Sequence, residues 1–274
     1  MSGVFSVAWL NLREAADLRA RGKTLRDKAQ QWLGIGPLAG SISPHEAIVV
    51  DLGAGTGSTL RALSAPGSQQ LVWRLVDSDG DLLDEALRRH GRDYRIEDYQ
   101  NDLAVIGELP LGGARLVTAS ALFDLLSAAL VDTLVARLQA QCKSWPIGLY
   151  AALNYDGTTA WSPPHAYDAA VLAAFNRDQR RDKGTGAALG PDSGDYLVKV
   201  LQQAGFTVHS AHSPWQLGPA EADMVEELIN GITAAVGADP ELDAAALQQW
   251  QQFRLAHATT GTCMVGHIDV LALP

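Results

Sequence analysis

The sequence predicts an α/β protein with a mostly parallel, Rossmann-like sheet, and two observations carry that prediction. The first is the apolar β-branched run at 48–50, Ile-Val-Val, which is typical of a strand buried on both faces. The second is the alternation of strand-like and helix-like segments after it, because such alternation gives parallel strands joined by right-handed crossovers. Ligands of such sheets bind beyond the carboxyl ends of the strands, so the residues there are the first candidates for a site.

Residue patterning places the other elements along the chain. Apolar residues at helical spacing predict one or two amphipathic helices over 9–33, with Leu10 and Leu18 inward and Arg13, Asp17 and Arg21 outward or toward a cleft. Further strands are expected at 71–76, 94–99, 114–119, 147–153, 206–210 and 263–272. Further helices are expected at 81–89, 122–141, 167–175, 196–204, 220–236 and 244–257.

A glycine turn follows the first strand. Asp51 closes the strand, and Gly53, Gly55 and Gly57 then occupy alternate positions before a helix that begins near Ser58. Glycine adopts positive φ without strain and lets a ligand come close to the backbone. The dinucleotide fingerprint G-x-G-x-x-G would need glycine where Ser58 stands, so the spacing favours another nucleotide.

Two more acidic residues follow the next two strands. Asp77 closes the second strand, where a carboxylate can accept hydrogen bonds from both ribose hydroxyls; nicotinamide enzymes use the same position. Asp102 follows the third strand and by itself indicates an Asx turn. Asp102 is, however, the third acidic residue that follows a predicted strand, after Asp51 and Asp77, and this regularity favours a cofactor role instead.

The order apolar-apolar-Asp51-Leu52-Gly53-x-Gly55-x-Gly57 resembles the first motif of class I S-adenosylmethionine-dependent methyltransferases. The resemblance implies a seven-stranded sheet with helices on both faces and a last strand inserted antiparallel between two earlier ones. It also implies S-adenosylmethionine as the cofactor, with an Asp after the third strand on the adenine amino group and the next backbone group on a ring nitrogen. The implied cofactor-binding residues are Asp51, Gly53, Ala54, Gly55, Gly57, Asp77, Ser78, Asp102, Leu103 and Ser120.

The chain is expected to form one methyltransferase domain, 1–274, with three additions to the minimal fold. These are an N-terminal helical cap at 1–46 and lid-like helical insertions at 154–195 and 211–260. N-terminal helices often cover the cofactor pocket in the resembled family. Arg13 or Arg21 would then reach a carboxylate of cofactor or substrate, and a solvated helix face is the alternative.

Methyl transfer requires a nucleophile held in line with the sulfonium, and a base when the acceptor is a hydroxyl or ammonium group. The catalytic candidates at the active edge are Tyr155, Asp156 and His165, with Asp124 further away. Asp156 and Gly157 also form an ordinary turn pair, and a histidine in a loop is more often solvated than catalytic.

The densest basic cluster of the chain lies at 176–183. Arg180 and Arg181 are substrate-binding candidates, because arginine grips a carboxylate or phosphate with two parallel hydrogen bonds. An exposed charged loop is the alternative. Trp161 is a candidate for an apolar acceptor pocket, although aromatic residues in such regions more often pack in a core or lid.

Composition narrows the function classes. A net charge of −10 argues against binding the phosphate backbone of nucleic acid. Cys142 and Cys263 are too far apart to indicate a disulfide framework or zinc site, and no cluster suggests a metal. The first ten residues lack the features of a signal peptide, and charges interrupt the most apolar stretch, 119–138. We expect a cytoplasmic protein that does not enter membranes, with a small-molecule acceptor as partner and a homodimer as an open option.

Three hypotheses of function remain. The first is a methyltransferase that uses S-adenosylmethionine on a small-molecule acceptor. The second is an NAD(P)-dependent oxidoreductase, disfavoured by Ser58 at the third glycine position. The third is a protein that binds S-adenosylmethionine without transferring its methyl group, because a fold does not dictate a chemistry.

Overall fold

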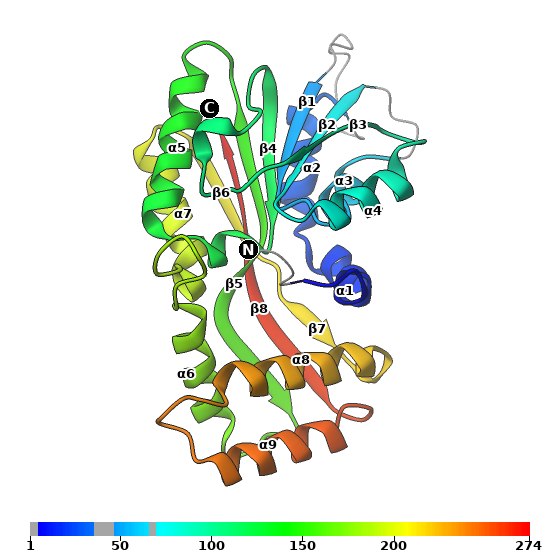
Figure 1. Cartoon of the computed structure of the whole chain (residues 1–274), viewed down its shortest axis with the longest axis vertical. Helices are drawn as coiled ribbons and strands as arrows, with labels where there is room; N and C mark the ends of the chain where they lie inside the picture. The colour runs from blue at the N-terminus through cyan, green and yellow to red at the C-terminus, as the bar shows by residue number, and fades with distance from the viewer. Residues whose placement is uncertain (1–4, 36–46, 66–69) are drawn as a thin grey trace.

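The structure, a computed structural model, describes residues 5–35, 47–65 and 70–274. Within them, eight strands form one sheet in the order β3-β2-β1-β4-β5-β8-β6, with β7 paired to β8 (Figure 1). The strands are β1 (Ala47–Leu52), β2 (Leu71–Asp77), β3 (Arg95–Gln100), β4 (Ala114–Ser120), β5 (Gly148–Ser162), β6 (Thr207–His212), β7 (Trp215–Leu217) and β8 (Thr262–Leu273).

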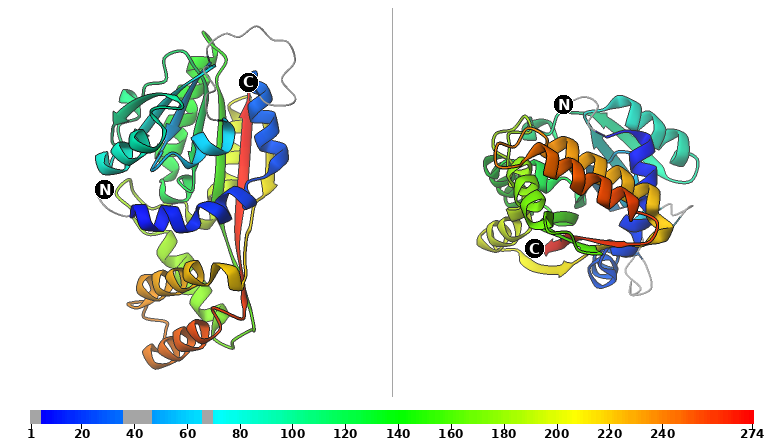
Figure 2. Two further views of the ribbon diagram at one scale, coloured as in Figure 1. Left: turned by 90° about the vertical axis from the view of Figure 1, so that its right-hand side faces the viewer. Right: turned by 90° about the horizontal axis from the view of Figure 1, so that it is seen from below.

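Helices cover both faces of this sheet and one end of the molecule (Figures 1 and 2). The α-helices are α1 (Val7–Ala20), α2 (Lys23–Trp32), α3 (Ser58–Leu63), α4 (Gly80–His90), α5 (Ala128–Cys142), α6 (Asp168–Gln179), α7 (Ser193–Gln203), α8 (Ala222–Val236) and α9 (Ala244–Ala256). Short 3-10 helices are η1 (Ile106–Glu108), η2 (Phe123–Leu125), η3 (Gly190–Asp192) and η4 (Pro219–Glu221). No helix in the described ranges is both long and apolar enough to cross a bilayer.

The topology confirms the expected arrangement of the sheet. Strands β1 to β5 pair in parallel, and β8 enters antiparallel between β5 and β6. The first predicted strand is buried on both sides, as its apolar run requires. Val50 packs in a core with side chains of α5 and α7, whereas Val49 packs in a second core with those of α2, α3 and α4. All carboxyl ends of the parallel strands therefore meet at one edge.

The fifth strand is longer than predicted, and β7 was not predicted. Instead of ending at residue 153, β5 continues to Ser162 and pairs with β8 almost throughout. This ladder, extended by β7, projects beyond the parallel part of the sheet as an arm, and α6, α8 and α9 pack around it (Figure 1). A separate core lies in the arm, with Trp250 and Ile229 fully buried. The segments 154–195 and 211–260 thus contribute most of this lobe.

The turn expected at Asp156-Gly157 is a β-bulge inside β5. The pairing with β8 shifts register between Tyr155 and Thr159, and Gly157 has φ +85°. Bulges and turns favour the same residue types because both need unusual backbone angles. A sequence pattern alone therefore does not separate the two.

The N-terminal segment forms two helices, α1 and α2, within the part of 1–46 that is described. The predicted helix at 122–141 is divided into η2 and α5, because Ser127 caps α5 by accepting from the Leu130 N–H. The remainder of the 1–46 cap, residues 1–4 and 36–46, lies outside the described residues.

Candidate functional site

The glycine turn after β1 has the backbone conformation that its residues predict. Gly53, Gly55 and Gly57 have φ of +61°, +53° and +84°. A Cβ on Gly53 would lie 3.1 Å from Leu122 Cδ1, and one on Gly55 would lie 3.2 Å from Leu10 Cδ1. The Ala54 N–H donates to the Val76 carbonyl, which ties the turn to β2. The turn is therefore closely covered by α1 on one side and by the β4–α5 connection on the other.

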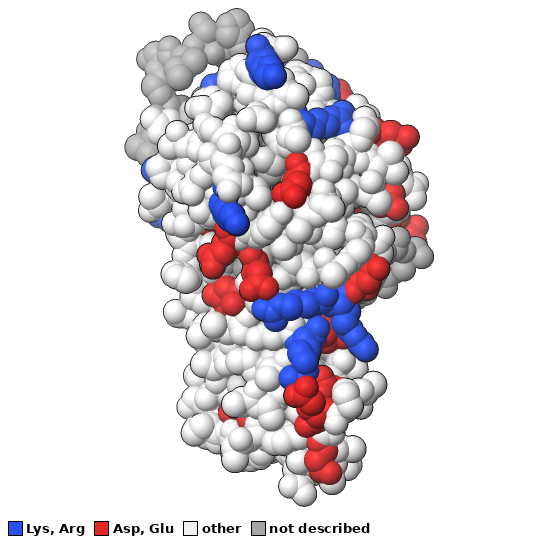
Figure 3. Space-filling model, turned by 90° about the vertical axis from the view of Figure 1, so that its left-hand side faces the viewer, with Lys and Arg blue, Asp and Glu red and all other residues white. Residues whose placement is uncertain are grey.

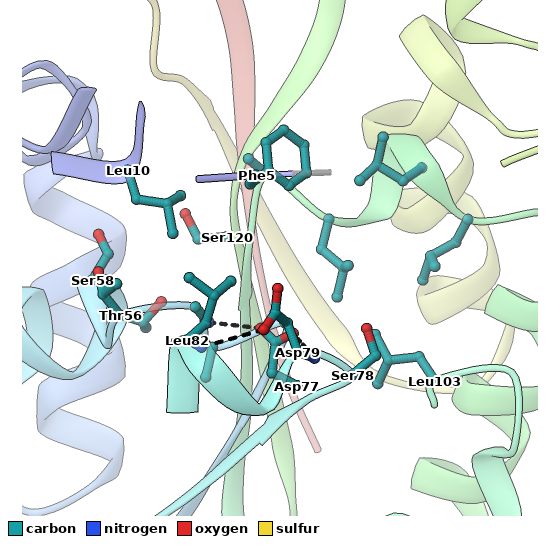
Figure 4. A pocket seen from close by; sticks show the side chains of 18 of the residues that line it. Phe5, Leu10, Thr56, Ser58, Asp77, Ser78, Asp79, Leu82, Leu103 and Ser120 are labelled. Carbon is teal, nitrogen blue, oxygen red and sulfur yellow. Dashed lines mark hydrogen bonds between the residues drawn. The ribbon is translucent and has the colours of Figure 1, made fainter. Parts of the chain in front are cut away.

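A cavity of about 210 Å³ opens above this turn at the carboxyl ends of the parallel strands. Eight of the ten predicted cofactor-binding residues line it. These are Gly53, Ala54, Gly55, Asp77, Ser78, Asp102, Leu103 and Ser120. Figure 4 shows Thr56, Ser58 and Leu10 toward one end and Ser78 and Leu103 toward the other.

The end of the cavity beside β2 presents acceptor oxygens. Asp77 accepts the Gly55 N–H through Oδ2 at 2.8 Å and the Asp79 N–H through Oδ1 at 3.0 Å (Figure 4). These bonds fix the carboxylate and leave a lone pair on each oxygen for a ligand. Asp79 itself caps α4 by accepting the Asp81 N–H.

Asp102 forms the Asx turn that its sequence context indicates, and it also lines the cavity. Its Oδ1 accepts the Ala104 N–H at 2.9 Å, as in an Asx turn. Its Oδ2 is not used in that turn, and the residue lines the cavity. Over the described ranges the Leu103 N–H has no hydrogen-bond partner. One acceptor and one donor thus stand side by side here.

The opposite end of the cavity presents two hydroxyl groups backed by a cation. Arg21 donates through Nη2 to Ser120 Oγ at 2.9 Å and to Ser58 Oγ at 3.2 Å. Each serine oxygen accepts from Arg21, so its own O–H is left to donate, and neither hydroxyl donates within the described parts. Arg21 is 3% exposed, and its Nε and Nη1 have no partner there. This end is suited to an anionic group.

Asp51 and Gly57 do not line the cavity. Asp51 lies beneath it, 1% exposed, and its Oδ1 accepts the Thr118 hydroxyl at 2.7 Å. Burial raises the pKa of Asp51 to about 7, against the Thr118 hydrogen bond and the charge of Arg21, which lower it. Its Oδ2 lacks a partner in the described residues. Gly57 precedes α3 and closes the turn through its N–H on the Ala54 carbonyl.

The charged residues along one side of α1 face the cavity end of the molecule. The spacing of apolar residues in this helix does not predict that orientation. Arg13, Asp17 and Arg21 are buried at helical spacing, whereas Leu18 is 50% exposed. Arg13 and Asp17 line the cavity together with Leu10 and Phe5. The expectation that Leu18 faces inward was wrong. The side of α1 that faces inward carries Arg13 and Asp17, which form an ion pair with each other and line the cavity.

The three catalytic candidates lie outside the cavity lining because β5 carries them into the arm. Tyr155 donates its hydroxyl to Asn176 Oδ1 at 2.8 Å. Asp156 accepts both the N–H and the hydroxyl of Thr158. The ring of His165 accepts the Tyr167 N–H and lies 4.9 Å from that of Phe253. The sequence predicts these side chains at the active edge, but in the structure none of the three lines the cavity.

The substrate-binding candidates are also elsewhere. Arg180 pairs with Asp192 at 2.9 Å and Arg181 with Asp178 at 3.3 Å, both on the surface. Figure 3 shows blue and red side chains meeting on this side of the molecule. Trp161 packs in the arm, 6.1 Å from the Trp250 ring. The basic side chains of the 176–183 cluster are thus already paired with carboxylates of the chain. Within this cluster, Lys183 alone lines the cavity.

Asp124 does not line the cavity either, but residues close to it in the chain do. Its neighbours Leu122 and Leu125 line the wall, and Asp124 is 8% exposed. Its Oδ1 has no partner among the described residues. Burial raises its pKa to about 6, and the charges of Arg13 and Lys183 oppose that rise.

Comparisons with known proteins find similarity in structure alone. No family model and no curated protein matches the sequence. The fold is similar to that of a cyclopropane-fatty-acyl-phospholipid synthase-like protein from Lactobacillus casei, with TM-score 0.50, 12% identity and coverage of 95% of this chain and 98% of that one.

Two further solved structures are similar at lower TM-scores. A putative methyltransferase from Bacillus halodurans has TM-score 0.47 and 18% identity, over 85% of this chain and 94% of that chain. Magnesium protoporphyrin IX methyltransferase from Synechocystis, with bound SAH, has TM-score 0.47 and 12% identity, over 99% and 89%. With its strand order and its antiparallel β8, the chain has the Rossmann-like fold of class I methyltransferases.

Proposed function

We propose that the chain is an S-adenosylmethionine-dependent methyltransferase that acts on a small-molecule acceptor. The observation that carries the proposal is the polarity of the cavity. Acceptor oxygens of Asp77 and Asp102 stand at one end, and the Ser58 and Ser120 hydroxyls, backed by Arg21, stand at the other. A ligand with a nucleoside at one end and a carboxylate at the other complements this arrangement.

The residues are assigned by the hydrogen bonds they still have to offer. Asp77 would hold the ribose hydroxyls through its remaining lone pairs, and Asp102 with the Leu103 N–H would hold the adenine edge. Ser58 and Ser120 would donate to the carboxylate of the amino-acid part, with Arg21 supplying the charge behind them. Asp51, beneath the turn, would favour the ammonium group electrostatically.

An NAD(P) cofactor fits the cavity less well. A dinucleotide places a pyrophosphate against the helix that follows the glycine turn, and it carries no terminal carboxylate for the serine end. Here Leu10 of α1 covers the turn closely, and Ser58 replaces the third glycine.

Methyl transfer mainly requires the protein to position the acceptor against the methyl group. When bound, S-adenosylmethionine supplies a methyl group already activated on a sulfonium. Apolar side chains of Phe5, Leu10, Leu122 and Leu125 line the cavity and would exclude water from the reacting atoms. Holding an acceptor in line can lower a barrier by about 7–11 kcal/mol in favourable intramolecular cases. For an acceptor that loses a proton, the Asp124 carboxyl is the base we propose, because it lies between the lining residues Leu122 and Leu125 in the chain and is ionised above its pKa of about 6.

Calorimetry with S-adenosylhomocysteine, 5′-methylthioadenosine and NAD tests the assignment. Arg21→Met keeps the buried volume but removes the cation. This variant should therefore bind S-adenosylhomocysteine at least tenfold more weakly than wild type. Methylthioadenosine lacks the amino-acid part, and its affinity should change less than twofold. Arg19→Met is the matched control, because Arg19 pairs with Glu221 on the exposed side of α1.

Several outcomes decide between the hypotheses. Binding of NAD without S-adenosylhomocysteine would favour the oxidoreductase. Equal weakening of both adenosine compounds by Arg21→Met would refute the carboxylate assignment. Binding of S-adenosylhomocysteine with no methyl transfer, in a screen of small-molecule acceptors with labelled S-adenosylmethionine, would favour a binding protein.

A further inference from the structure

Arg13 lines the cavity, unlike Arg21, which lies behind the serine hydroxyls, and the fold holds Arg13 rigidly. It is 8% exposed, and its Nε donates to Asp17 Oδ2 at 2.8 Å. The other oxygen of Asp17 accepts the Trp215 indole N–H at 2.9 Å. The guanidinium lies 5.1 Å from the centroid of that same indole ring. A side chain fixed at Nε and on one face loses little freedom when its remaining nitrogens bind a ligand.

The two terminal nitrogens of Arg13 have no hydrogen-bond partner in the described parts of the chain, although the residue lines the cavity. These nitrogens open to the cavity, so they can donate to a ligand without breaking a hydrogen bond within the protein. A carboxylate or phosphate oxygen pair would accept from them in the parallel geometry that arginine favours. The structure around Arg13 is therefore prepared for an anion.

The cavity near Arg13 contains one more cation. Lys183 lines the cavity from the loop after α6, with its Nζ 3.3 Å from Asp178 Oδ2. That loop is held in place by the Leu189 N–H on the Leu126 carbonyl at 2.8 Å and by the Ser127 N–H on Thr185 Oγ1 at 3.3 Å. Two elements far apart in the sequence thus bring positive charge to the same cavity.

Arg13 and Arg21 have different polar partners, which are Asp17 for Arg13 and the hydroxyls of Ser58 and Ser120 for Arg21. The two arginines are eight positions apart, about 12 Å along the helix axis, with Arg13 inside α1 and Arg21 at its C-cap. The proposed carboxylate of the cofactor belongs to Arg21 and its two serines. The group that Arg13 would bind is therefore a different one.

We propose that Arg13 recognises an anionic group of the methyl acceptor, either a carboxylate or a phosphate. This inference rests on the proposed function, because it assigns the acceptor to the part of the cavity that the cofactor leaves open. The acceptor class is then a small molecule that carries one such group beside its nucleophilic atom. Asp17 and Trp215 act as positioning residues for Arg13.

The test uses the full chain saturated with S-adenosylhomocysteine and three probes, namely benzoate, phenyl phosphate and neutral benzamide, titrated by ligand-observed NMR. Wild type should bind at least one of the two anions, and the stronger one identifies the group. Arg13→Gln should lower the affinity for that anion about tenfold and leave the affinity for benzamide unchanged. Arg13→Lys retains the charge but lacks the paired N–H groups, so it should weaken the anion less than Arg13→Gln does.

The controls separate this inference from the proposed function. Arg180→Gln removes an exposed arginine that already pairs with Asp192, and it should leave the binding of every probe unchanged. Arg13→Gln should retain its affinity for S-adenosylhomocysteine within about twofold, which also reports that the variant is folded. Failure of wild type to bind S-adenosylhomocysteine contradicts the proposed function itself.

Three results would overturn the inference while the cofactor assignment stands. The first is that wild type binds neither anion more tightly than benzamide. The second is that Arg13→Gln and Arg13→Lys both bind the anion as wild type does. The third is that Arg13→Gln loses S-adenosylhomocysteine instead of the anion, which would make Arg13 a cofactor residue.

Discussion

Asp51 makes the floor of the cavity sensitive to pH, and the size of the effect follows from its burial. The carboxyl group is 1% exposed, and its Oδ1 accepts the Thr118 hydroxyl. Burial raises its pKa from 3.8 to about 7. A group with a raised pKa in the folded state stabilises the fold fully below its unfolded pKa, and that stability is lost as the pH rises through the folded value. The shift corresponds to about 4 kcal/mol.

The variant Asp51→Asn isolates this contribution. Asparagine has nearly the same shape, does not ionise, and keeps an oxygen that accepts from Thr118. Urea unfolding of both proteins at pH values from 4 to 8 gives the difference in their free energies of unfolding. We expect that difference to change by about 4 kcal/mol over the range, in favour of the variant at the alkaline end. Other titrating groups, such as Asp124, are common to both proteins and cancel.

Parallel stability curves for the two proteins would refute this reasoning. Thr118→Val adds a directional check, because removing the hydroxyl removes an interaction that lowers the Asp51 pKa. In that variant the loss of stability should move to higher pH. A move to lower pH would show that the hydroxyl does not act on the ionised carboxylate.

Two further predictions concern the strand β8. Asp269→Ala should lower the free energy of unfolding by about 3 kcal/mol or more in urea, because the Gly22 N–H, the Leu153 N–H and the Ser213 hydroxyl lose their common acceptor; a loss below 1 kcal/mol would contradict this. Gly266→Ala should cost about 1–3 kcal/mol, since a Cβ there overlaps the side chains of Asp156 and Thr158, and it should leave S-adenosylhomocysteine affinity unchanged. Gly231→Ala is the control, because a Cβ at this position in α8 meets open space, and it should raise the free energy of unfolding by about 0.4–1 kcal/mol. A destabilised control would show that crowding does not explain the effect at Gly266.

The end of the cavity that Asp77 and Asp102 line was predictable because its sequence signals are local. A parallel strand buried on both faces is a continuous apolar run, and the topology then brings the residues after each strand to one edge. Asp77 and Asp102 could therefore be placed together from the sequence, and both line the cavity. The sequence pattern marks Ser58 as a helix start and as a missing third glycine, but it does not indicate that this residue lines the same cavity.

The arm and the charged face of α1 were not predictable in the same way. The extension of β5 depends on pairing with β8, as in Tyr155 with His267, and no residue near Tyr155 in the sequence indicates that partner. Apolar patterning assumes that charged residues face water. That assumption fails on α1, where Arg13 and Asp17 pair with each other against Trp215, a residue of an unpredicted strand.

The last strand also determines where Arg21 lies, and this links the two ends of the chain. Asp269, fully buried in β8, accepts the Gly22 N–H at 2.9 Å and so fixes the turn between α1 and α2, directly after Arg21. The same carboxylate accepts the Leu153 N–H at the point where β5 leaves the parallel sheet. Because one buried group holds both segments, the cation behind the serine hydroxyls is set by a residue near the end of the sequence. The segment 48–153, which bears the family resemblance, therefore supplies Asp77 and Asp102 at one end of the cavity but not the positive charge at the other end.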